Sequence, residues 1–76
     1  MHPAELREHL RKRPFQPFRI VLANGKWFDI RSSEGIVVTT VETAVVEHDE
    51  IRTFGNSQIL EIVPLSGIER VSPELS

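Results

Sequence analysis

Hydrophobic residues recur with two different periods along the chain, and the change of period separates a short helix from a series of strands. Over residues 3–12, Leu6 and Leu10 lie one helical turn apart in an otherwise polar segment. Pro3 suits the first turn of a helix, and Pro14 cannot continue one. The pattern predicts a helix whose apolar stripe is too narrow to be stable alone, so we expect it to dock on the remaining chain.

The clearest turn signal is Asn24-Gly25, which lies between two β-prone segments, residues 18–22 and 26–31. A two-residue loop would place Ile20 opposite Asp29 and mix charge into both faces of the hairpin. A three-residue loop with Gly25 in a left-handed bulge keeps one face apolar. This bulged register pairs Phe18 with Ile30, Arg19 with Asp29, Ile20 with Phe28 and Val21 with Trp27.

Further strands are predicted where β-branched residues gather between turn residues. These segments are residues 36–40, 44–48, 57–63 and 68–71. A turn is expected at Glu42-Thr43, and the polar residues 49–56 are expected to form the longest and most mobile loop. The chain is thus predicted to be one mainly β domain, an N-terminal helix followed by a five- or six-stranded, strongly bent antiparallel sheet or small barrel.

This order of elements resembles the Sm-like fold, as in the bacterial Sm-like RNA chaperone, in which a short helix caps a strongly bent SH3-like barrel. Residues 20–26 resemble the first hairpin of that fold, and residues 59–71 resemble its last two strands. The connector Arg13-Pro14-Phe15-Gln16-Pro17-Phe18 is also similar to that of a set of short uncharacterised bacterial proteins. The resemblance implies a bacterial protein with a small Sm-like barrel.

The RNA site of the chaperone family has no counterpart in this chain. In that family a Lys-His pair before the last strand contacts RNA in the pore of a ring, whereas this chain has Leu65-Ser66-Gly67-Ile68 at the matching place. Residues 36–56 also form a longer segment than the corresponding part of the family. The resemblance therefore implies the fold and not the RNA site.

Composition narrows the class of protein further. The 76 residues contain no cysteine, which excludes disulfides and thiolate metal sites and favours a reducing, cytoplasmic compartment. No apolar segment is long enough to span a membrane. The net charge of −2 divides into a basic first half, residues 1–31, and an acidic second half, residues 32–76. An acidic total argues against a dedicated binder of duplex nucleic acid, although it leaves room for a local basic face.

Candidate catalytic chemistry is sparse. The three histidines, His2, His9 and His48, have no metal-ligand spacing, and the adjacent His48-Asp49-Glu50 reads more simply as an exposed strand end than as an ion site. No nucleophile lies beside a base, and no glycine-rich loop is present to hold a phosphate. We therefore expect no enzymatic activity, no cofactor and no metal.

Two kinds of binding remain open. Single-stranded RNA would fit cations beside an aromatic ring. The side chains that offer this surface to RNA or to another partner are Arg7, Arg11, Arg13, Arg19, Lys26 and Trp27. Cations at the end of a helix also stabilise its dipole without any ligand, and a single tryptophan often covers a small apolar cluster.

Protein interaction, including self-assembly, is the function that the sequence favours. Residues 59–63 and 68–71 are apolar strands that would pair with the edge of a neighbouring molecule, as the strands of Sm-like rings do. The same apolar strands would equally serve as the core of the domain. A homo-oligomer or a module that binds a protein partner is therefore the prediction, and weak RNA binding is the alternative.

Overall fold

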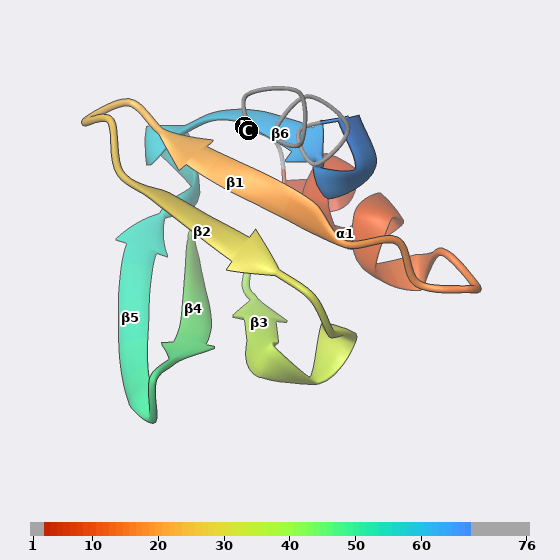
Figure 1. Ribbon diagram of the computed structural model, residues 1–76. Coiled ribbons are helices and arrows are strands. Elements are labelled where there is room, and N and C mark those ends of the chain that lie inside the picture. The colour runs from red at the N-terminus through yellow and green to blue at the C-terminus, as the bar shows by residue number, and fades with distance from the viewer. Residues whose placement is uncertain (1–2, 68–76) are drawn as a thin grey trace, which may run out of the picture.

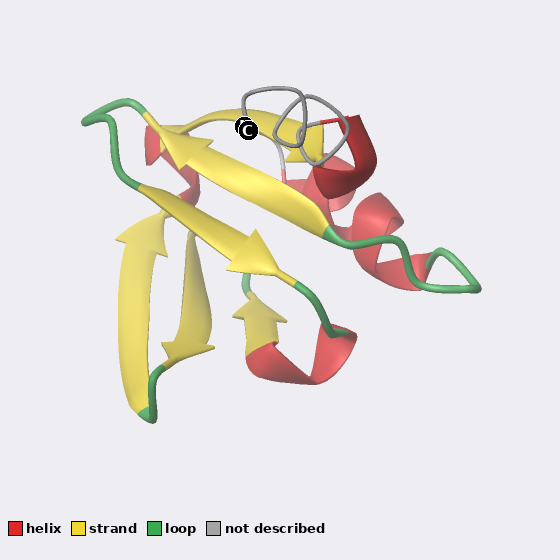
Figure 2. Cartoon of the chain, viewed as in Figure 1, coloured by secondary structure: helices red, strands yellow, loops and turns green. Residues whose placement is uncertain are grey.

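The computed structural model describes residues 3–67, which form an N-terminal helix and six strands, followed by helical residues 65–67 (Figure 1). The elements are α1 (Pro3–Arg11), β1 (Phe18–Leu22), β2 (Trp27–Ile30), the 3₁₀ turn η1 (Ser33–Gly35), β3 (Ile36–Val38), β4 (Glu42–Glu47), β5 (Glu50–Gly55), the 3₁₀ turn η2 (Asn56–Gln58) and β6 (Ile59–Pro64). Figure 2 distinguishes these helices and strands by colour. The strand predicted over residues 68–71 lies outside the described residues.

The strands form two antiparallel sheets, with the orders β2-β1-β6 and β3-β4-β5. The two sheets cross at an angle, and α1 lies behind them in Figure 1. The prediction of a mainly β domain with an N-terminal helix is confirmed, but within residues 3–67 the strands do not close into a barrel. The chain leaves each sheet through a 3₁₀ turn, η1 after β2 and η2 after β5, which interrupts the ladders at both crossings.

The first hairpin has the predicted bulged register, with all four cross-strand pairs as expected. Gly25 has a φ of 88°, and its N–H donates to the Leu22 carbonyl at 3.0 Å. The Leu22 N–H donates to the Lys26 carbonyl at 2.8 Å and closes the loop. The predicted hairpin is therefore confirmed. This register is favoured because it separates the Arg19–Asp29 pair from the apolar face.

The turn predicted at Glu42-Thr43 is wrong. The chain turns at Thr40-Val41 instead, and both Glu42 and Thr43 belong to β4. Thr39 holds this turn, because its N–H donates to the Glu42 carbonyl at 2.8 Å and its hydroxyl accepts from the Glu42 N–H at 3.0 Å. The threonine hydroxyl thus replaces the glycine or asparagine that usually marks a tight turn.

The long mobile loop predicted over residues 49–56 is also wrong, because residues 50–55 form β5. The turn before it consists of His48 and Asp49, whose φ angles are 51° and 64°. Two consecutive left-handed residues make the type of tight turn that matches the twist of a hairpin. Asp and His adopt this conformation more readily than most residues, so the turn forms without glycine.

The core lies between the facing sides of the two sheets and is closed at one end by α1. Its buried side chains are Leu6, Phe18, Ile20, Leu22, Ile30, Ile36, Val45, Phe54 and Ile59. Leu6 is the point at which α1 docks, as its narrow apolar stripe predicts, and it has no exposed surface. Buried and half-buried residues alternate along β1 because successive side chains of a strand point to opposite faces of its sheet.

One buried polar pair lies at the point where the chain passes from one sheet to the other. The Thr43 hydroxyl in β4 donates to the Asn56 side-chain oxygen in η2 at 2.6 Å, and both residues are buried. The Asn56 side-chain amide donates to the Thr39 carbonyl at 2.9 Å, and the Asn56 N–H donates to the Val41 carbonyl at 2.9 Å. Asn56 therefore ties η2 to the turn between β3 and β4.

A substitution at Gly25 tests the hairpin. No atom lies within 4 Å of the position that a Cβ would occupy, so steric contact is not limiting and the cost comes from the backbone. We expect Gly25→Val to lower the free energy of unfolding by about 1 kcal/mol or more, because a β-branched residue resists a positive φ. Chemical denaturation measures the loss.

Two companion variants sharpen this test. Gly25→Asn should recover most of the stability, since asparagine tolerates the left-handed conformation. Gly35→Val, at a glycine with open space and no positive φ, should cost much less. Equal stability of the Gly25 and Gly35 valine variants would contradict the assignment.

Replacing Thr43 by valine tests the buried polar pair. The change keeps the shape of the side chain but leaves the Asn56 oxygen without its 2.6 Å donor. We expect the free energy of unfolding to fall by about 1–3 kcal/mol. The matched control is Thr53→Val, at an exposed position of β5, which should change stability little; similar effects at both sites would disprove the role of the pair.

Candidate functional site

The outer side of the first hairpin carries an ordered cluster around Trp27. The Arg19 guanidinium makes two hydrogen bonds to the Asp29 carboxylate, at 2.6 and 3.1 Å. Its Cζ also lies 5.1 Å from the centre of the Trp27 ring. The hydrogen bond to Asp29 raises the pKa of Arg19, so this guanidinium stays charged. Trp27 is 55% exposed, and the Arg19 guanidinium holds its ring in place at the surface.

Two adjoining pockets lie beside this cluster, between the first hairpin and β5, and together we call them the hairpin cleft. The pocket that reaches Trp27, which we call the outer part, has a volume of about 440 Å³, and the other, the inner part, about 340 Å³; Lys26, Phe28 and Arg52 line both. Gly25, Trp27 and Glu47 complete the outer part. Leu22, Asn24, Ile51, Thr53, Phe54 and Gln58 complete the inner part. Figure 1 shows β2 beginning beside the end of β5.

The floor of the hairpin cleft is aromatic. The Phe28 and Phe54 rings stack with their centres 5.4 Å apart and 17° from parallel. Phe28 comes from β2 and Phe54 from β5, so the stack joins the two sheets below the cleft. An apolar floor with a few polar groups around it is the usual composition of a binding site.

The charges at the hairpin cleft are mixed. Lys26 and Arg52 are exposed cations, and Glu47 is a half-buried anion in the outer part. Arg52 forms an ion pair with Glu50 at 2.7 Å, but both side chains are more than half exposed, so the pair is weak. Arg52 is the only lysine or arginine between residues 32 and 67. The single cation of this acidic stretch therefore lies at the cleft.

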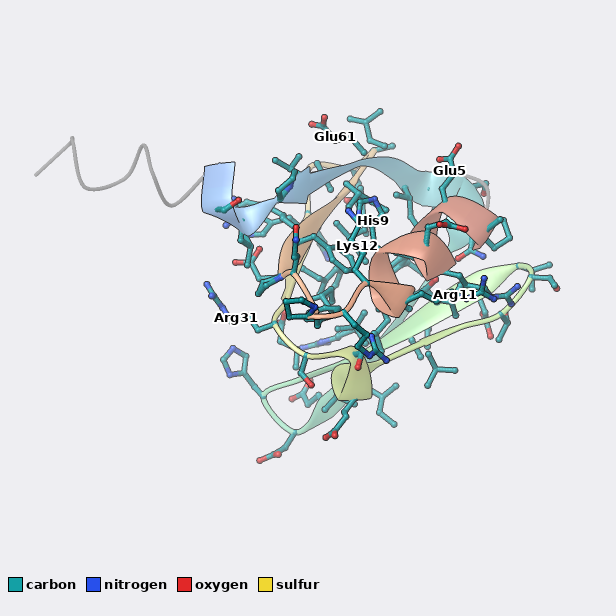
Figure 3. The ribbon with its side chains drawn as sticks, turned by 90° about the vertical axis from the view of Figure 1, so that its right-hand side faces the viewer. Glu5, His9, Arg11, Lys12, Arg31 and Glu61 are labelled. Carbon is teal, nitrogen blue, oxygen red and sulfur yellow. The ribbon has the colours of Figure 1, made fainter. Side chains whose placement is uncertain are left out.

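The six predicted site residues do not form one surface. Arg19, Lys26 and Trp27 gather on the first hairpin, whereas Arg7, Arg11 and Arg13 lie on α1 or directly after it. The Arg7 guanidinium donates to the Val38 carbonyl at 3.4 Å. Figure 3 shows Arg11 on α1.

Arg13 also has a structural role. Its guanidinium donates to the Leu10 carbonyl at 3.0 Å and to the Lys12 carbonyl at 2.8 Å, which satisfies acceptors at the end of α1. Three of the five predicted cations, Arg7, Arg13 and Arg19, thus hold other parts of the protein. Fewer cations therefore remain to bind the phosphates of a nucleic acid.

Sequence reasoning missed Arg52, Glu47 and Phe54. Arg52 and Phe54 lie in the segment predicted to be a loop, and a loop assignment gives neither side chain a fixed neighbour. The alternating β-branched residues Ile51 and Thr53 are the signal that predicts a strand in this segment.

A second surface feature is the outward side of the β3-β4-β5 sheet, which we call the outer apolar face. It consists of Val37, Ala44, Val46, Ile51 and Thr53. Val37, Val46 and Ile51 are 63%, 56% and 72% exposed, and Val46 lies directly opposite Ile51. None of these five residues is charged, and the exposed Glu42 lies beyond them at the start of β4 on the same side of the sheet. Leu60 in β6, on the other sheet, is also 65% exposed.

Metal-binding clusters and membrane-spanning helices are both missing from the part of the chain that the structure describes. No three histidine or carboxylate side chains among residues 3–67 lie close enough together to hold a metal ion. Over the same residues no helix is both long and apolar enough to cross a membrane.

The environment of His9, in α1, changes its titration. Its ring lies against Phe18, with the centres 5.2 Å apart. Partial burial lowers the pKa of His9 below its ordinary value of 6.5, and the nearby Lys12 lowers it further, while Glu5 and Glu8 act in the opposite direction. Folding therefore favours the neutral imidazole.

The lowered pKa of His9 predicts a pH dependence of stability. Below pH 6.5 the unfolded chain binds a proton that the folded chain resists, so the contribution of His9 is present above that pH and is lost as the pH falls through it. Between about pH 7.5 and about pH 5.5 we expect wild type to lose more stability than His9→Gln. Thermal unfolding measures this difference, with His48→Gln in the exposed β4–β5 turn as control; identical pH profiles for wild type and His9→Gln would contradict it.

Comparisons with known proteins supply no relative from which a site can be transferred. No protein-family model matches the chain, and no curated protein or solved structure matches it significantly. The Sm-like resemblance therefore stays a prediction.

Proposed function

We propose that this protein is a non-enzymatic interaction module of the bacterial cytoplasm that associates with copies of itself through strand edges and the outer apolar face. The observation that carries the proposal is the exposure of Val37, Val46 and Ile51 on one side of a sheet, where Ala44 and Thr53 are their uncharged neighbours. Exposed apolar side chains that are contiguous on a surface are typical of interaction sites, whereas single ones are not.

The energetics favour a second copy on this face. Full burial of an exposed valine or isoleucine side chain contributes about 1.5–3 kcal/mol of favourable free energy. Pairing two such faces would bury several of these side chains at once. Because these five residues carry no charge, two copies bring no like charges together at the centre of the contact, and Glu42 lies outside it at the start of β4. Self-association therefore has a driving force and no electrostatic barrier at the centre of the contact.

Strand edges provide the other half of the proposed contact. Within residues 3–67, β3 and β5 are the edge strands of one sheet, and β2 and β6 are those of the other. β6 carries the exposed Leu60 and belongs to the segment predicted to pair with a neighbour. An edge strand with apolar side chains is a template for pairing with another chain. Pairing of this kind would assemble a homo-oligomer, as the Sm-like resemblance implies.

A protein partner is favoured over RNA because several of the cations that RNA would need already bind other groups of this protein. Arg7 and Arg13 donate to backbone carbonyls, and Arg19 is bound by Asp29. A surface that tracks a phosphate backbone needs several free cations in a row. The observed arrangement supports a protein contact better.

Solution mass tests the proposal. Light scattering coupled to size exclusion should give a defined oligomer at low and at high salt, because an apolar contact is insensitive to ionic strength. Val46→Lys introduces a charge at the centre of the outer apolar face, and Leu60→Lys introduces one on β6. At least one of these two variants should give the mass of a single chain, and which of them does so identifies the surface that forms the contact.

The control for these variants is Gln16→Lys, at an exposed position in the connector after α1. It should keep the mass of wild type. A wild-type protein that has the mass of a single chain at every concentration tested would refute the proposal.

A further inference from the structure

The hairpin cleft is bounded by two strands that each end a sheet. β2 ends the order β2-β1-β6, and β5 ends the order β3-β4-β5. The two edges approach each other, since the Phe28 and Phe54 rings stack between them, but no ladder joins them. Two sheet edges thus face one cleft.

The registers show which backbone groups point into the cleft. The Leu22–Lys26 hydrogen bond marks a bonded pair, so by alternation the backbone groups of Trp27 and Asp29 point away from β1. In the second hairpin the two-residue turn makes Glu47 and Glu50 a bonded pair. The backbone groups of the β5 residues Ile51 and Thr53 therefore point away from β4.

Trp27, Ile51 and Thr53 all line the cleft, which places their outward-pointing backbone groups at its walls. An extended peptide is the ligand that satisfies a row of alternating backbone donors and acceptors. Side chains of such a peptide alternate, so every second one would face the Phe28–Phe54 floor. A ligand that consists only of a planar ring would leave the backbone groups of these strand edges without hydrogen-bond partners.

The charges indicate the composition of the peptide. Lys26 is exposed at the junction of the outer and inner parts, and Arg52, the single cation of its acidic stretch, lines the same two parts. Glu47 stands only in the outer part, and the ion pair between Glu50 and Arg52 is exposed and weak, so a carboxylate of a ligand can replace Glu50 at Arg52. Carboxylates of a ligand therefore find cations at the centre of the cleft, and apolar side chains find the aromatic floor.

From this geometry we propose that the hairpin cleft binds an extended segment of a partner protein in which acidic residues alternate with apolar ones. The segment adds as a strand to β5 or β2, places apolar side chains against the Phe28–Phe54 stack and places carboxylates beside Lys26 and Arg52. The inference extends the proposed function from self-association to recognition of a different protein. The cleft adjoins the outer apolar face at Ile51 and Thr53, but Val46 and Leu60 do not line it. Substitutions at Val46 and Leu60 therefore test self-association, and substitutions at Lys26 and Arg52 test peptide binding, so each proposal can fail without the other.

Selection from a random octapeptide phage library tests the proposal and assumes no particular partner. Immobilised full-length protein should enrich peptides with alternating acidic and apolar residues. Trp27 is the only tryptophan, so its fluorescence reports binding of a selected peptide at the cleft itself. We expect Lys26→Glu and Arg52→Glu each to weaken that binding about tenfold or more, the effect of losing one charge-assisted hydrogen bond.

Three controls decide the interpretation. Lys12→Glu, at an exposed cation of the connector after α1, should bind as wild type does. A proline in the middle of the selected peptide should abolish binding, because it removes a backbone donor. Val46→Lys should keep peptide binding even where it changes the solution mass.

Several results would overturn the proposal. Enrichment of basic peptides, or of none, would exclude the predicted ligand. A selected peptide that tolerates the proline and both charge reversals would bind elsewhere. A hexamer of adenylate that binds at the Trp27 fluorophore, where no peptide does, would show that the cleft recognises nucleic acid instead.

Discussion

The arrangement of the protein depends on the hydrogen bond between Thr43 and Asn56. This bond lies at the corner where the chain leaves the β3-β4-β5 sheet and enters β6 of the other sheet. A buried amide without partners is costly, so the corner is stable only in the geometry that serves the Thr39, Val41 and Thr43 contacts together. Apolar packing fills the space between the sheets, but it is not directional, and the polar corner selects the angle at which they cross.

That crossing angle determines what the surface offers. The edges of β2 and β5 meet over the Phe28–Phe54 stack and then diverge, which opens the hairpin cleft. On the far side of the β3-β4-β5 sheet nothing in the described region covers Val46 and Ile51. One arrangement of two small sheets therefore produces both candidate surfaces, the cleft between them and the apolar face behind one of them. A domain of this size buries so little of its surface that uncovered apolar residues are expected at some face.

The first hairpin can be predicted from the sequence because local and long-range requirements agree. Asn24-Gly25 marks the turn, and only one register puts Arg19 opposite Asp29 while keeping Ile20 on the apolar side. The later turns are harder, since they are made by Thr39 and by His48-Asp49, residues whose turn-forming ability depends on their neighbours. The hairpin cleft is beyond sequence reasoning, because Lys26 and Arg52 belong to different sheets and meet only through the packing of the two.

The β4–β5 turn has a consequence for how the chain tolerates change. His48 and Asp49 are exposed at the end of a hairpin, and no core side chain comes from either of them. Exposed loop tips are where inserted sequence is accommodated, since lengthening a loop adds only a small closure entropy. Insertions at His48-Asp49 are thus open to evolution and to the experimenter as an attachment point. An insertion at Asn56, eight residues after His48, would instead break buried hydrogen bonds.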